Sequence, residues 1–289
     1  MTLKHTLRRA GKILAANNIE DARLESELLL RHILKINPTQ LYLDINHELD
    51  NEQEKSFWNL IERRLNHEPT AYLLKHREFY GLEFYVDSNV LIPRQESELL
   101  VEKALELARK YTVSTIAEVG TGSGAIAISL ALNLPRAKIY ATDISAPALK
   151  VALFNCQKHG VGNRIHLLLG DMLNPLPEPV DLIVANLPYV KESEVSPASS
   201  EPSLALNGGV DGLDKIQRLC YQVSDKLPTN GCLLLEIGQG QARAVTSFLG
   251  NIFPLAEIEV LPDLRGIDRV VSLIPRQSPK LNPPPVAAR

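Results

Sequence analysis

The chain has 289 residues, of which 45% are hydrophobic and 22% are charged, a composition typical of a soluble globular protein with one large and one smaller domain. Its formal net charge of -3 disfavours a protein that holds long duplex DNA, because neutralising the phosphates requires a basic face. No apolar run approaches the roughly 18 residues of a membrane span. The three cysteines are widely separated and form no C-x-x-C pair, which disfavours a zinc site and indicates a reducing cytoplasm. We therefore expect a cytoplasmic protein without a metal site, a membrane partner or direct nucleic-acid binding.

Residues 1–75 are predicted to form a small helical domain. Apolar residues at helical spacing predict helices over residues 2–17, 21–34, a short segment after Pro38, and residues 51–65. In the second of these helices, Leu24, Leu28 and Leu29 are expected on the buried side. Basic and acidic residues are equally numerous in this domain, so it is not an electrostatic clamp for a polyanion. We interpret it as a substrate-recognition domain or a lid.

A change of periodicity marks residues 76–93. β-Branched and aromatic residues form two runs, 78–80 and 82–86, on either side of Gly81, and a third run at 90–92 follows polar turn residues. Such runs separated by turn residues are typical of a β-hairpin. We expect this hairpin to link the helical domain to the domain that follows.

From residue 94 to residue 276 the predicted helices and strands alternate. Strands are expected at residues 115–119, 138–142, 164–169, 182–185, 232–236, 256–261 and 269–273. Helices are expected at residues 96–110, 125–134, 146–159, 213–227 and 241–249. This alternation predicts an α/β fold, in which a mostly parallel, doubly wound sheet carries helices on both faces.

The last two predicted strands decide the fold class. They are joined by residues 262–268, a connection too short for a crossover helix, so they must pair antiparallel. A seven-stranded sheet with an antiparallel last strand is the methyltransferase variant of the doubly wound fold, and it differs from the six-stranded dinucleotide-binding sheet. Beyond the sheet, residues 277–289 are rich in proline and are expected to form a disordered tail.

A glycine-rich loop follows the first strand of this sheet and opens a helix. It reads Glu118-Val119-Gly120-Thr121-Gly122-Ser123-Gly124, whereas a nicotinamide-binding loop would place its third glycine one residue later. Glycines let the backbone turn tightly and approach a ligand closely. The Glu118 carboxylate suits a cationic ligand such as S-adenosylmethionine, because it attracts the ammonium group. We therefore expect this cofactor, with its amino-acid part and ribose packed against Gly120, Thr121, Gly122, Ser123 and Gly124.

Two acidic residues follow the next two strands. Asp143, with Ile144 beside it, ends the second strand, where a carboxylate can accept both ribose hydroxyls of the cofactor. Asp171 follows the third strand at the position expected for the adenine amino group, and Met172 can pack on the ring face. Both acids can instead be solvated caps ahead of the next elements.

The tetrapeptide Asn186-Leu187-Pro188-Tyr189 follows the fourth strand directly, at the carboxyl edge of the sheet where doubly wound folds bind ligands. An amide or aromatic amino nitrogen carries two N–H bonds, which the Asn186 side-chain oxygen and the Leu187 backbone carbonyl can accept. Pro188 fixes the backbone that presents this carbonyl, and Tyr189 can stack on the planar group. The nitrogen becomes more positive as the new bond forms, so both acceptors gain strength in the transition state. A strand-ending turn is the structural alternative.

With these motifs, the sequence resembles the peptide chain release factor glutamine methyltransferase family over most of its length. Besides the loop and the tetrapeptide, the similar stretches are residues 68–73, 78–80, 91–94, 96–98, 201–202, 205–206, 208–212 and 266–269. The resemblance implies methyl transfer from S-adenosylmethionine to N5 of the glutamine in the Gly-Gly-Gln motif of bacterial class 1 release factors. It also implies that the helical domain grips the release factor.

The resemblance assigns roles to individual residues as well. It places residues 120–124, Asp143, Asp171, Met172 and Asn186 at the cofactor, and residues 186–189 at the glutamine. Arg94 and Glu201 are candidate residues of the pocket rim, or a structural ion pair. The family usually has Asn-Pro-Pro-Tyr, and this chain has Leu187 in place of the first proline. Leucine keeps the carbonyl but loses the rigid dihedral angle, which predicts retained activity with slower turnover.

Three other functions fit parts of the pattern. An enzyme that methylates a glutamine in a ribosomal protein shares the catalytic residues, so only the substrate-gripping helical domain separates the two. An amino methyltransferase that acts on a nucleic-acid base uses the same tetrapeptide, but it needs a base-reading domain or a basic channel. A cofactor-binding protein without catalysis is disfavoured by the intact Asn186 and Tyr189. We expect a monomer whose partner is a class 1 release factor.

Overall fold

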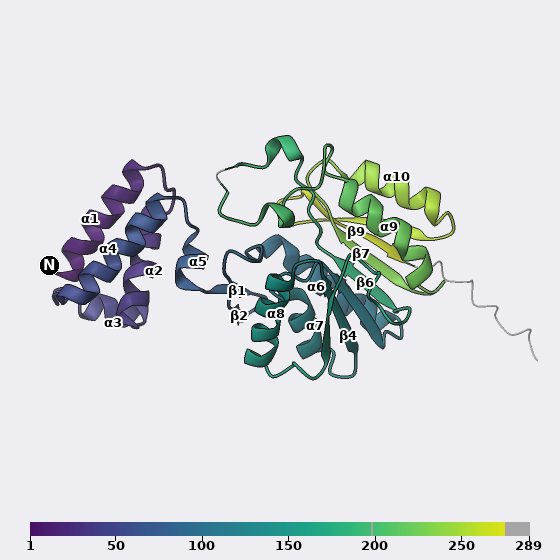
Figure 1. Ribbon diagram of the computed structural model, residues 1–289, viewed down its shortest axis with the longest axis horizontal. Coiled ribbons are helices and arrows are strands. Elements are labelled where there is room, and N and C mark those ends of the chain that lie inside the picture. The colour runs from purple at the N-terminus through teal and green to yellow at the C-terminus, as the bar shows by residue number, and fades with distance from the viewer. Residues whose placement is uncertain (198, 275–289) are drawn as a thin grey trace, which may run out of the picture.

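The structure is a computed structural model that describes residues 1–197 and 199–274. A bundle formed by the first helices lies beside an α/β domain, and a short segment joins the two (Figure 1). The tail expected over residues 277–289 lies outside the described residues. Within the described ranges, no helix is long and apolar enough to cross a membrane.

Four helices build the N-terminal bundle: α1 (Leu3–Ala16), α2 (Ala22–Leu34), α3 (Pro38–Leu43) and α4 (Asn51–Leu65). Each lies where the helical spacing of apolar residues predicts it. Asn37 and Asp50 form capping boxes at the starts of α3 and α4, which satisfies backbone N–H groups that the helices leave free. The apolar faces meet in a core that includes Leu14, Leu29 and Phe57.

The buried face of α2 differs in part from the prediction. Its buried residues are Ala22, Ser26, Leu29 and Leu30, which lie along one face of the helix. Leu24, which was expected on this face, is 54% exposed because it lies off this stripe. The Ser26 hydroxyl donates to the Ala22 carbonyl at 2.6 Å, so the one polar side chain on the buried face is satisfied within the helix.

A fifth helix, α5 (Thr70–Leu74), lies between the bundle and the α/β domain and was not predicted. Its Leu73 packs in the core of the bundle, whereas its Tyr72 packs with Val86 and Val90 of the connecting segment. The Tyr72 hydroxyl also donates to the Val90 carbonyl at 2.6 Å. Adjacent side chains of one short helix therefore contact both parts of the molecule.

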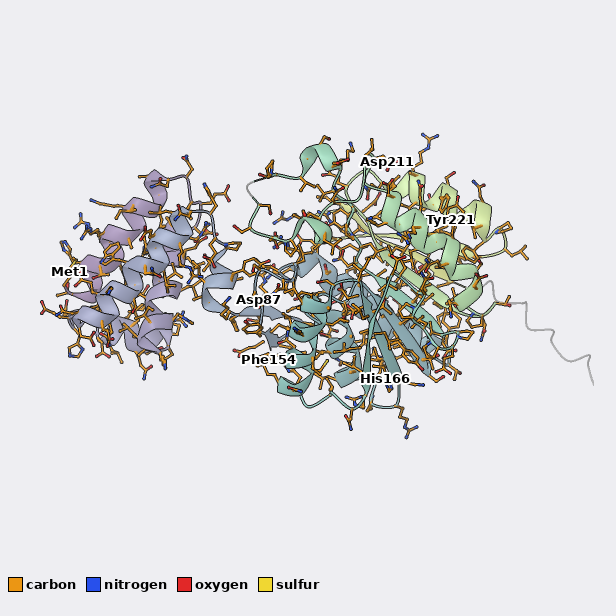
Figure 2. The ribbon with its side chains drawn as sticks, viewed as in Figure 1. Met1, Asp87, Phe154, His166, Asp211 and Tyr221 are labelled. Atoms are coloured by element: carbon orange, nitrogen blue, oxygen red, sulfur yellow. The ribbon has the colours of Figure 1, made fainter. Side chains whose placement is uncertain are left out.

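The predicted hairpin is confirmed for its first two runs. Strands β1 (Arg77–Phe79) and β2 (Leu82–Phe84) pair antiparallel. The third run, residues 90–92, forms no strand, and the Ile92 N–H donates instead to the Glu201 carboxylate at 3.0 Å. Asp87 precedes this run and lies at the junction between the bundle and the α/β domain (Figure 2).

The α/β domain contains a seven-stranded sheet, as predicted, in the order β5-β4-β3-β6-β7-β9-β8. Its strands are β3 (Thr115–Val119), β4 (Lys138–Asp143), β5 (Ile165–Leu169), β6 (Leu182–Ala185), β7 (Cys232–Glu236), β8 (Glu257–Pro262) and β9 (Asp268–Ile274). The strands from β3 to β7 run parallel, whereas β9 pairs antiparallel with both β7 and β8. The helices of this domain are α6 (Glu98–Lys110), α7 (Ala125–Asn133), α8 (Ala146–Lys158), α9 (Asp214–Lys226) and α10 (Ala242–Ile252).

Alternate residues of the strands belong to two separate apolar layers. In β6, Leu182 and Val184 pack in the cluster that contains the apolar residues of α6 and α7. Ile183 and Ala185 pack in the cluster that contains those of α9 and α10. The sheet is therefore buried between helices on both of its faces (Figure 1), which confirms the doubly wound fold.

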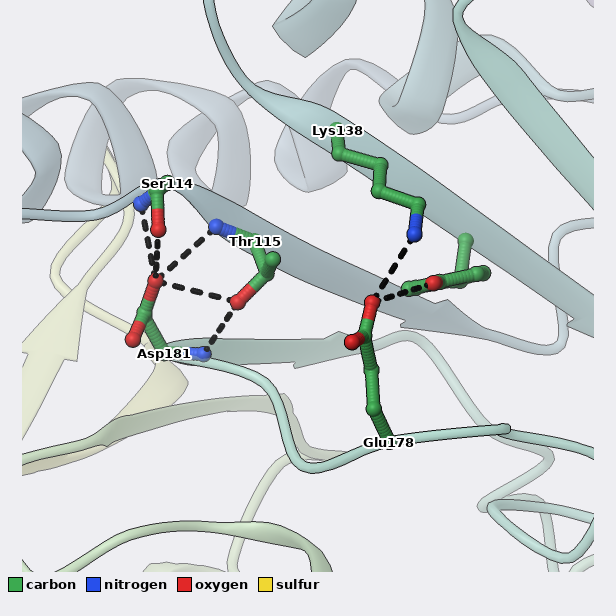
Figure 3. Close-up of polar contacts among 6 residues, drawn as sticks. Ser114, Thr115, Lys138, Glu178 and Asp181 are labelled. Atoms are coloured by element: carbon green, nitrogen blue, oxygen red, sulfur yellow. Dashed lines mark hydrogen bonds and ion pairs between the residues drawn. The ribbon is translucent and has the colours of Figure 1, made fainter.

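Asp181 ties the amino ends of β3 and β6 together. One oxygen of its carboxylate accepts the N–H and the hydroxyl of Ser114, at 2.8 and 2.8 Å, and those of Thr115, at 2.9 and 3.0 Å (Figure 3). Burial disfavours the ionised form, but these bonds outweigh it and lower the pKa of Asp181. Nearby, Glu178 forms an ion pair with Lys138 at 2.9 Å (Figure 3). This polar edge holds the two strands whose opposite ends carry the site described below.

Asp181→Ala is expected to lower the free energy of unfolding by about 1–3 kcal/mol, because four donors lose a charged acceptor. Urea unfolding at neutral pH measures the loss, and Asp225→Ala, which removes an exposed acid of α9, is the control. Because the folded-state pKa of Asp181 is lowered, its contribution is present above the ordinary pKa of 3.8 and is lost as the pH falls through the folded-state value. An Asp181→Ala protein as stable as the control would contradict this role.

Candidate active site

The glycine-rich loop lies between β3 and α7, at the carboxyl edge of the sheet. The N–H groups of Gly120 and Thr121 both donate to the Thr142 carbonyl, at 2.9 and 3.0 Å, which holds the loop against β4. Gly120 has a φ of 74°, a conformation that residues with a Cβ rarely adopt. A Cβ at this position would also lie 3.3 Å from Cδ2 of Leu187. Glycine at position 120 therefore lets the loop and the tetrapeptide approach each other closely.

Glu118, the first residue of the loop, is only 2% exposed. Its carboxylate accepts the Thr121 hydroxyl at 2.5 Å and the Ala127 N–H, in the first turn of α7, at 3.0 Å. Burial raises the pKa of Glu118 to about 8, although the two hydrogen bonds lower it. The carboxylate thus braces the loop from within while it borders the cavity beside it.

A cavity opens at this edge between the loop and the segments that follow β4, β5 and β6. Every predicted cofactor-binding residue except Gly124 lines it. Gly124 lies behind the cavity wall, where a Cβ would sit 3.2 Å from Cδ1 of Ile128 and 3.4 Å from Cβ of Ala152. Glycine is needed at position 124 so that α7 and α8 can pack closely. Close packing of this kind is one of the roles that the third glycine has in such loops.

Asp143 ends β4 at the floor of the loop. One carboxylate oxygen accepts the Gly122 N–H at 2.9 Å, and the other accepts the Ser145 N–H at 2.8 Å. Burial raises the pKa of Asp143, and these backbone bonds act against it. Each oxygen of a carboxylate has about two acceptor positions, so both retain one for a ligand hydroxyl.

Asp171 follows β5 and forms an ion pair with Arg218 of α9. Arg218 and its neighbour on the same helix face, Lys215, line the cavity, and neither was predicted from the sequence. They lie on an amphipathic helix far along the chain from the predicted motifs, and no motif surrounds them. Met172, beside Asp171, has a φ of 51° and also lines the cavity.

The tetrapeptide leaves the sheet beside the glycine-rich loop. Strands β3 and β6 are parallel neighbours in a register that places Val119 opposite Ala185. The chain therefore enters the loop and the tetrapeptide at adjacent points of the carboxyl edge. Asn186, Leu187 and Pro188 line the cavity. The structure thus brings these three predicted substrate residues into the cavity that most of the predicted cofactor residues line.

Two side chains of the tetrapeptide have defined surroundings. Leu187 is 4% exposed and packs in the apolar layer that also contains Val119. The Asn186 side chain donates from Nδ2 to the Ser97 hydroxyl at 2.9 Å. Its carbonyl oxygen Oδ1 is then available to accept a hydrogen bond in the cavity. Ser97, at the end of the short 3-10 helix η1 (Gln95–Ser97), was not predicted as a site residue.

Tyr189 does not line the cavity, so its predicted stacking on the substrate stays a prediction. Its hydroxyl donates to Oε1 of Glu236, the last residue of β7, at 3.1 Å. Burial and the neighbouring Glu236 carboxyl raise the pKa of Tyr189. The ring passes close to the backbone of Gly238, where a Cβ would lie 3.1 Å from Cδ2 of the tyrosine.

A second glycine-rich segment, residues 208–212, packs on the backbone of the tetrapeptide. A Cβ at Gly208 would lie 2.7 Å from the Pro188 carbonyl oxygen, and one at Gly212 would lie 2.3 Å from the Tyr189 carbonyl oxygen. The Gln241 side chain donates to the carbonyls of Tyr189 and Gly212, at 3.1 and 3.2 Å. These contacts fix the backbone that presents the tetrapeptide to the cavity.

Arg94 and Glu201 form an ion pair at the rim, with Nη2 and Oε2 at 2.5 Å. Arg94 lines the cavity, whereas Glu201 does not. Next to Glu201, the Ser200 hydroxyl donates to the His67 carbonyl at 3.2 Å, in the segment that leads from the bundle. The rim is therefore tied to both parts of the molecule. Within the described part of the chain, no group of three or more His, Cys, Asp or Glu side chains could hold a metal ion.

Known proteins similar to this chain share its two parts. A family model described as "PrmC N-terminal domain" matches residues 5–74, and one described as "Methyltransferase small domain" matches residues 95–204. A release factor glutamine methyltransferase of Moorella thermoacetica is 44% identical over 274 residues, which cover 93% of this chain and 97% of that protein. The one of Thermodesulfovibrio yellowstonii is 40% identical over 257 residues, or 86% and 91% of the two chains. The crystal structure of a ribosomal protein L11 methylase from Lactobacillus delbrueckii, 22% identical, shows the same fold with a TM-score of 0.50 over 66% of this chain and 84% of that one.

Glu118→Gln is expected to change how stability depends on pH. The folded-state pKa of Glu118 is about 8, whereas its ordinary value is 4.5. Between these two pH values the carboxyl group is protonated in the folded protein and ionised in the unfolded chain, so the protein loses stability as the pH rises from the lower value to the higher. Glutamine keeps an acceptor for Thr121 and stays neutral, so the variant should lack this loss of stability. Each unit of difference between the folded and unfolded pKa values corresponds to about 1.4 kcal/mol in the free energy of unfolding. The measurement is urea unfolding of both proteins between about pH 5 and pH 8. A stability difference that does not vary with pH would contradict the assignment.

Proposed function

Because this chain belongs to the release factor glutamine methyltransferase family, we propose that it transfers a methyl group from S-adenosylmethionine to the side-chain amide nitrogen of the glutamine in the Gly-Gly-Gln motif of class 1 release factors. This modification modulates translation termination. The observation that carries the proposal is the position of Asn186, which enters the glycine-loop cavity where β3 and β6 meet. Strand order reverses between these two strands, and doubly wound folds bind their ligands at that point.

The cavity suits this cofactor through the chemistry of its side chains. When bound, S-adenosylmethionine would supply a methyl group on a positively charged sulfur; a nitrogen lone pair attacks the methyl carbon, and S-adenosylhomocysteine leaves as its C–S bond breaks. The carboxyl groups of Glu118, Asp143 and Asp171 all line the cavity, where they can attract a cationic ligand. The free acceptor positions of Asp143 suit the two ribose hydroxyls. Glycine at position 120 leaves the loop backbone open to close approach.

The tetrapeptide holds the substrate amide. The Asn186 oxygen accepts one N–H of the glutamine and the Leu187 carbonyl accepts the other, which directs the nitrogen lone pair along the cavity. As the nitrogen gains positive charge, both acceptors stabilise it more strongly than they stabilise the ground state. The alkylated nitrogen is acidic enough to lose a proton to water, so the reaction needs no strong general base. Proximity of the two reactants supplies much of the remaining acceleration.

The helical bundle provides the grip on the release factor in this proposal. The contacts between Ser200 and His67, and between Glu201 and the Ile92 N–H, join the cavity rim to the segment that leads from the bundle. A protein substrate whose glutamine enters the cavity can therefore contact both parts at once. The formal net charge of -3 supports a protein partner rather than nucleic acid. We infer a monomer that acts in the cytoplasm, where release factors work.

The test of this proposal is methyl transfer to a purified class 1 release factor from labelled S-adenosylmethionine. Label is expected on the wild-type factor and is expected to disappear when the glutamine of its Gly-Gly-Gln motif is replaced by alanine, because only that amide nitrogen fits the tetrapeptide. Ribosomal proteins and ribosomal RNA, offered under the same conditions, serve as competing substrates. Label on the altered release factor, or on a competing substrate alone, would sink the assignment.

Leu187→Pro is expected to retain methyl transfer, with kcat within about tenfold of the wild type. The contact proposed at this position uses the backbone carbonyl, which proline keeps, while the buried leucine side chain packs against the glycine-rich loop. Steady-state kinetics with the release factor measure the change, and circular dichroism confirms that the variant is folded. A folded Leu187→Pro protein without any activity would contradict the role given to this carbonyl.

A further inference from the structure

Four polar side chains gather at the tetrapeptide: Ser97 and Asn186, which line the cavity, and Tyr189 and Glu236, which do not. The strand register assembles part of it, because β6 and β7 are parallel neighbours with Ala185 opposite Leu235. The residues that follow in register are Asn186 and Glu236, so both emerge at the same edge of the sheet. Ser97 reaches this edge from the start of α6.

Glu236 is the buried end of this group. It is 2% exposed, and Ser97 is 3% exposed. Its Oε1 accepts the Tyr189 hydroxyl at 3.1 Å, while its Oε2 is buried without a hydrogen-bond partner within residues 1–197 and 199–274. Burial raises the pKa of the Glu236 carboxyl, and the nearby hydroxyls of Ser97 and Tyr189 act against this by favouring the ionised form. A buried carboxylate oxygen without a partner lacks a donor. The Ser97 hydroxyl, which lowers the pKa of Glu236, can turn towards this oxygen.

The direction of the hydrogen bonds in this group follows from the chemistry of the Glu236 carboxylate. An ionised carboxylate can only accept hydrogen bonds, so a Ser97 hydroxyl that serves Glu236 must direct its single hydrogen towards that carboxylate. Ser97 then offers only a lone pair to its other neighbour, and the Asn186 side chain must meet it with its amide nitrogen. This is the observed contact, from Nδ2 to the Ser97 oxygen at 2.9 Å. The Asn186 carbonyl oxygen is left for the cavity.

The opposite arrangement would be unproductive. If the Asn186 amide were rotated by half a turn, its NH2 group would face the NH2 group of the substrate, and two sets of donors would oppose each other. Asparagine alone has no preference between the two orientations, because its oxygen and nitrogen ends have the same shape. A neighbour that accepts but does not donate removes this ambiguity.

We propose that Glu236 and Ser97 are positioning residues for the methyl transfer proposed above, and that they hold the Asn186 amide with its nitrogen inward and its carbonyl oxygen towards the substrate nitrogen. Glu236 lies outside the cavity, and Ser97, which lines it, acts through Asn186. Glu236 sets the direction of the hydrogen bonds, and Ser97 passes this direction to Asn186. The Tyr189 hydroxyl donates to the same carboxylate, so the first and the last residue of the tetrapeptide both depend on Glu236 in this proposal.

Activity is therefore expected to depend on the ionisation of Glu236. A protonated carboxyl can donate to Ser97, which would let Ser97 donate to the oxygen of Asn186 and reverse the chain. The charged and titratable groups that face Glu236 are Arg269 of β9, which favours its ionised form, Glu96 of η1, which disfavours it, and Tyr189. The kcat of the wild type should therefore fall as the pH is lowered through the raised pKa of Glu236, and Glu236→Gln should lack this decline.

The test compares Ser97→Ala, Ser97→Thr and Glu236→Gln with the wild type in methyl transfer to the release factor. Ser97→Ala is expected to lower kcat about tenfold while KM and the Kd of S-adenosylmethionine change less than about twofold. Ser97→Thr keeps the hydroxyl and is expected to restore most of the rate. Ser224→Ala, which alters an exposed serine of α9, is the matched control and is expected to leave kcat unchanged.

A second readout does not depend on activity. The side-chain N–H signals of Asn186 in a nuclear magnetic resonance spectrum can be assigned by their absence in Asn186→Asp. We expect these hydrogens to be protected from exchange with water in the wild type and in Ser97→Thr, and to lose protection in Ser97→Ala. If the wild type labels no release factor, the proposed function fails, and this comparison still decides the positioning role.

Three outcomes would overturn the inference. The first is a wild-type kcat in Ser97→Ala, and the second is an equal loss of kcat in Ser97→Ala and Ser97→Thr. The third is Asn186 side-chain protection that is the same in wild type and Ser97→Ala. The Ser97 variants change one small side chain and are expected to fold, so the inference remains testable even if Glu236→Gln does not fold.

Discussion

The parallel pairing of β3 with β6 is the constraint on which the rest of the site depends. It places Val119 opposite Ala185, so the glycine-rich loop and the tetrapeptide begin at neighbouring points of one sheet edge. A shift of this register by one residue would turn each side chain of β6 to the other face of the sheet and move Asn186 away from the loop. At the far end of the same two strands, Asp181 holds their amino ends with four hydrogen bonds. Hydrogen bonds at the amino ends of β3 and β6 thus help to fix the register that positions the site at their carboxyl ends.

The two edges of the sheet use carboxylates in opposite ways. At the amino edge, Asp181 is well supplied with donors, and its pKa is lowered. At the carboxyl edge, Glu118 and Glu236 are buried with few donors, and their pKa values are raised. An ionised carboxylate that is buried with few donors lowers the stability of the fold. Such groups gather where a protein binds charged ligands or orients reacting groups. One edge therefore stabilises the fold, and the other carries the chemistry.

Periodicity and motif order predicted the elements and most of the cavity, because buried strands and amphipathic helices repeat locally in the sequence. Leu24 was placed wrongly, since several leucines in one helix leave the buried stripe ambiguous. The run at residues 90–92 has strand-like composition, but it bonds to Glu201, which lies far along the chain. Ser97, Lys215, Arg218 and Glu236 were missed for a related reason: they belong to the site through strand register and helix packing. Ser97 lies in a stretch that resembles the family, but nothing in that stretch indicates its contact with Asn186. The sequence predicted motifs at the carboxyl edge, and the groups that orient them come from tertiary contacts.

In the proposed mechanism Asn186, which also borders the cofactor region, acts chiefly on the substrate nitrogen and not on the fold. Single-turnover methyl transfer by Asn186→Ala, measured together with the Kd of S-adenosylmethionine, tests it most directly. We predict a rate lower by about a hundredfold or more, as for the loss of one oriented acceptor of transition-state charge, with a cofactor Kd that changes less than about threefold. A rate close to that of the wild type, or a loss of rate matched by an equal loss of cofactor affinity, would contradict the account.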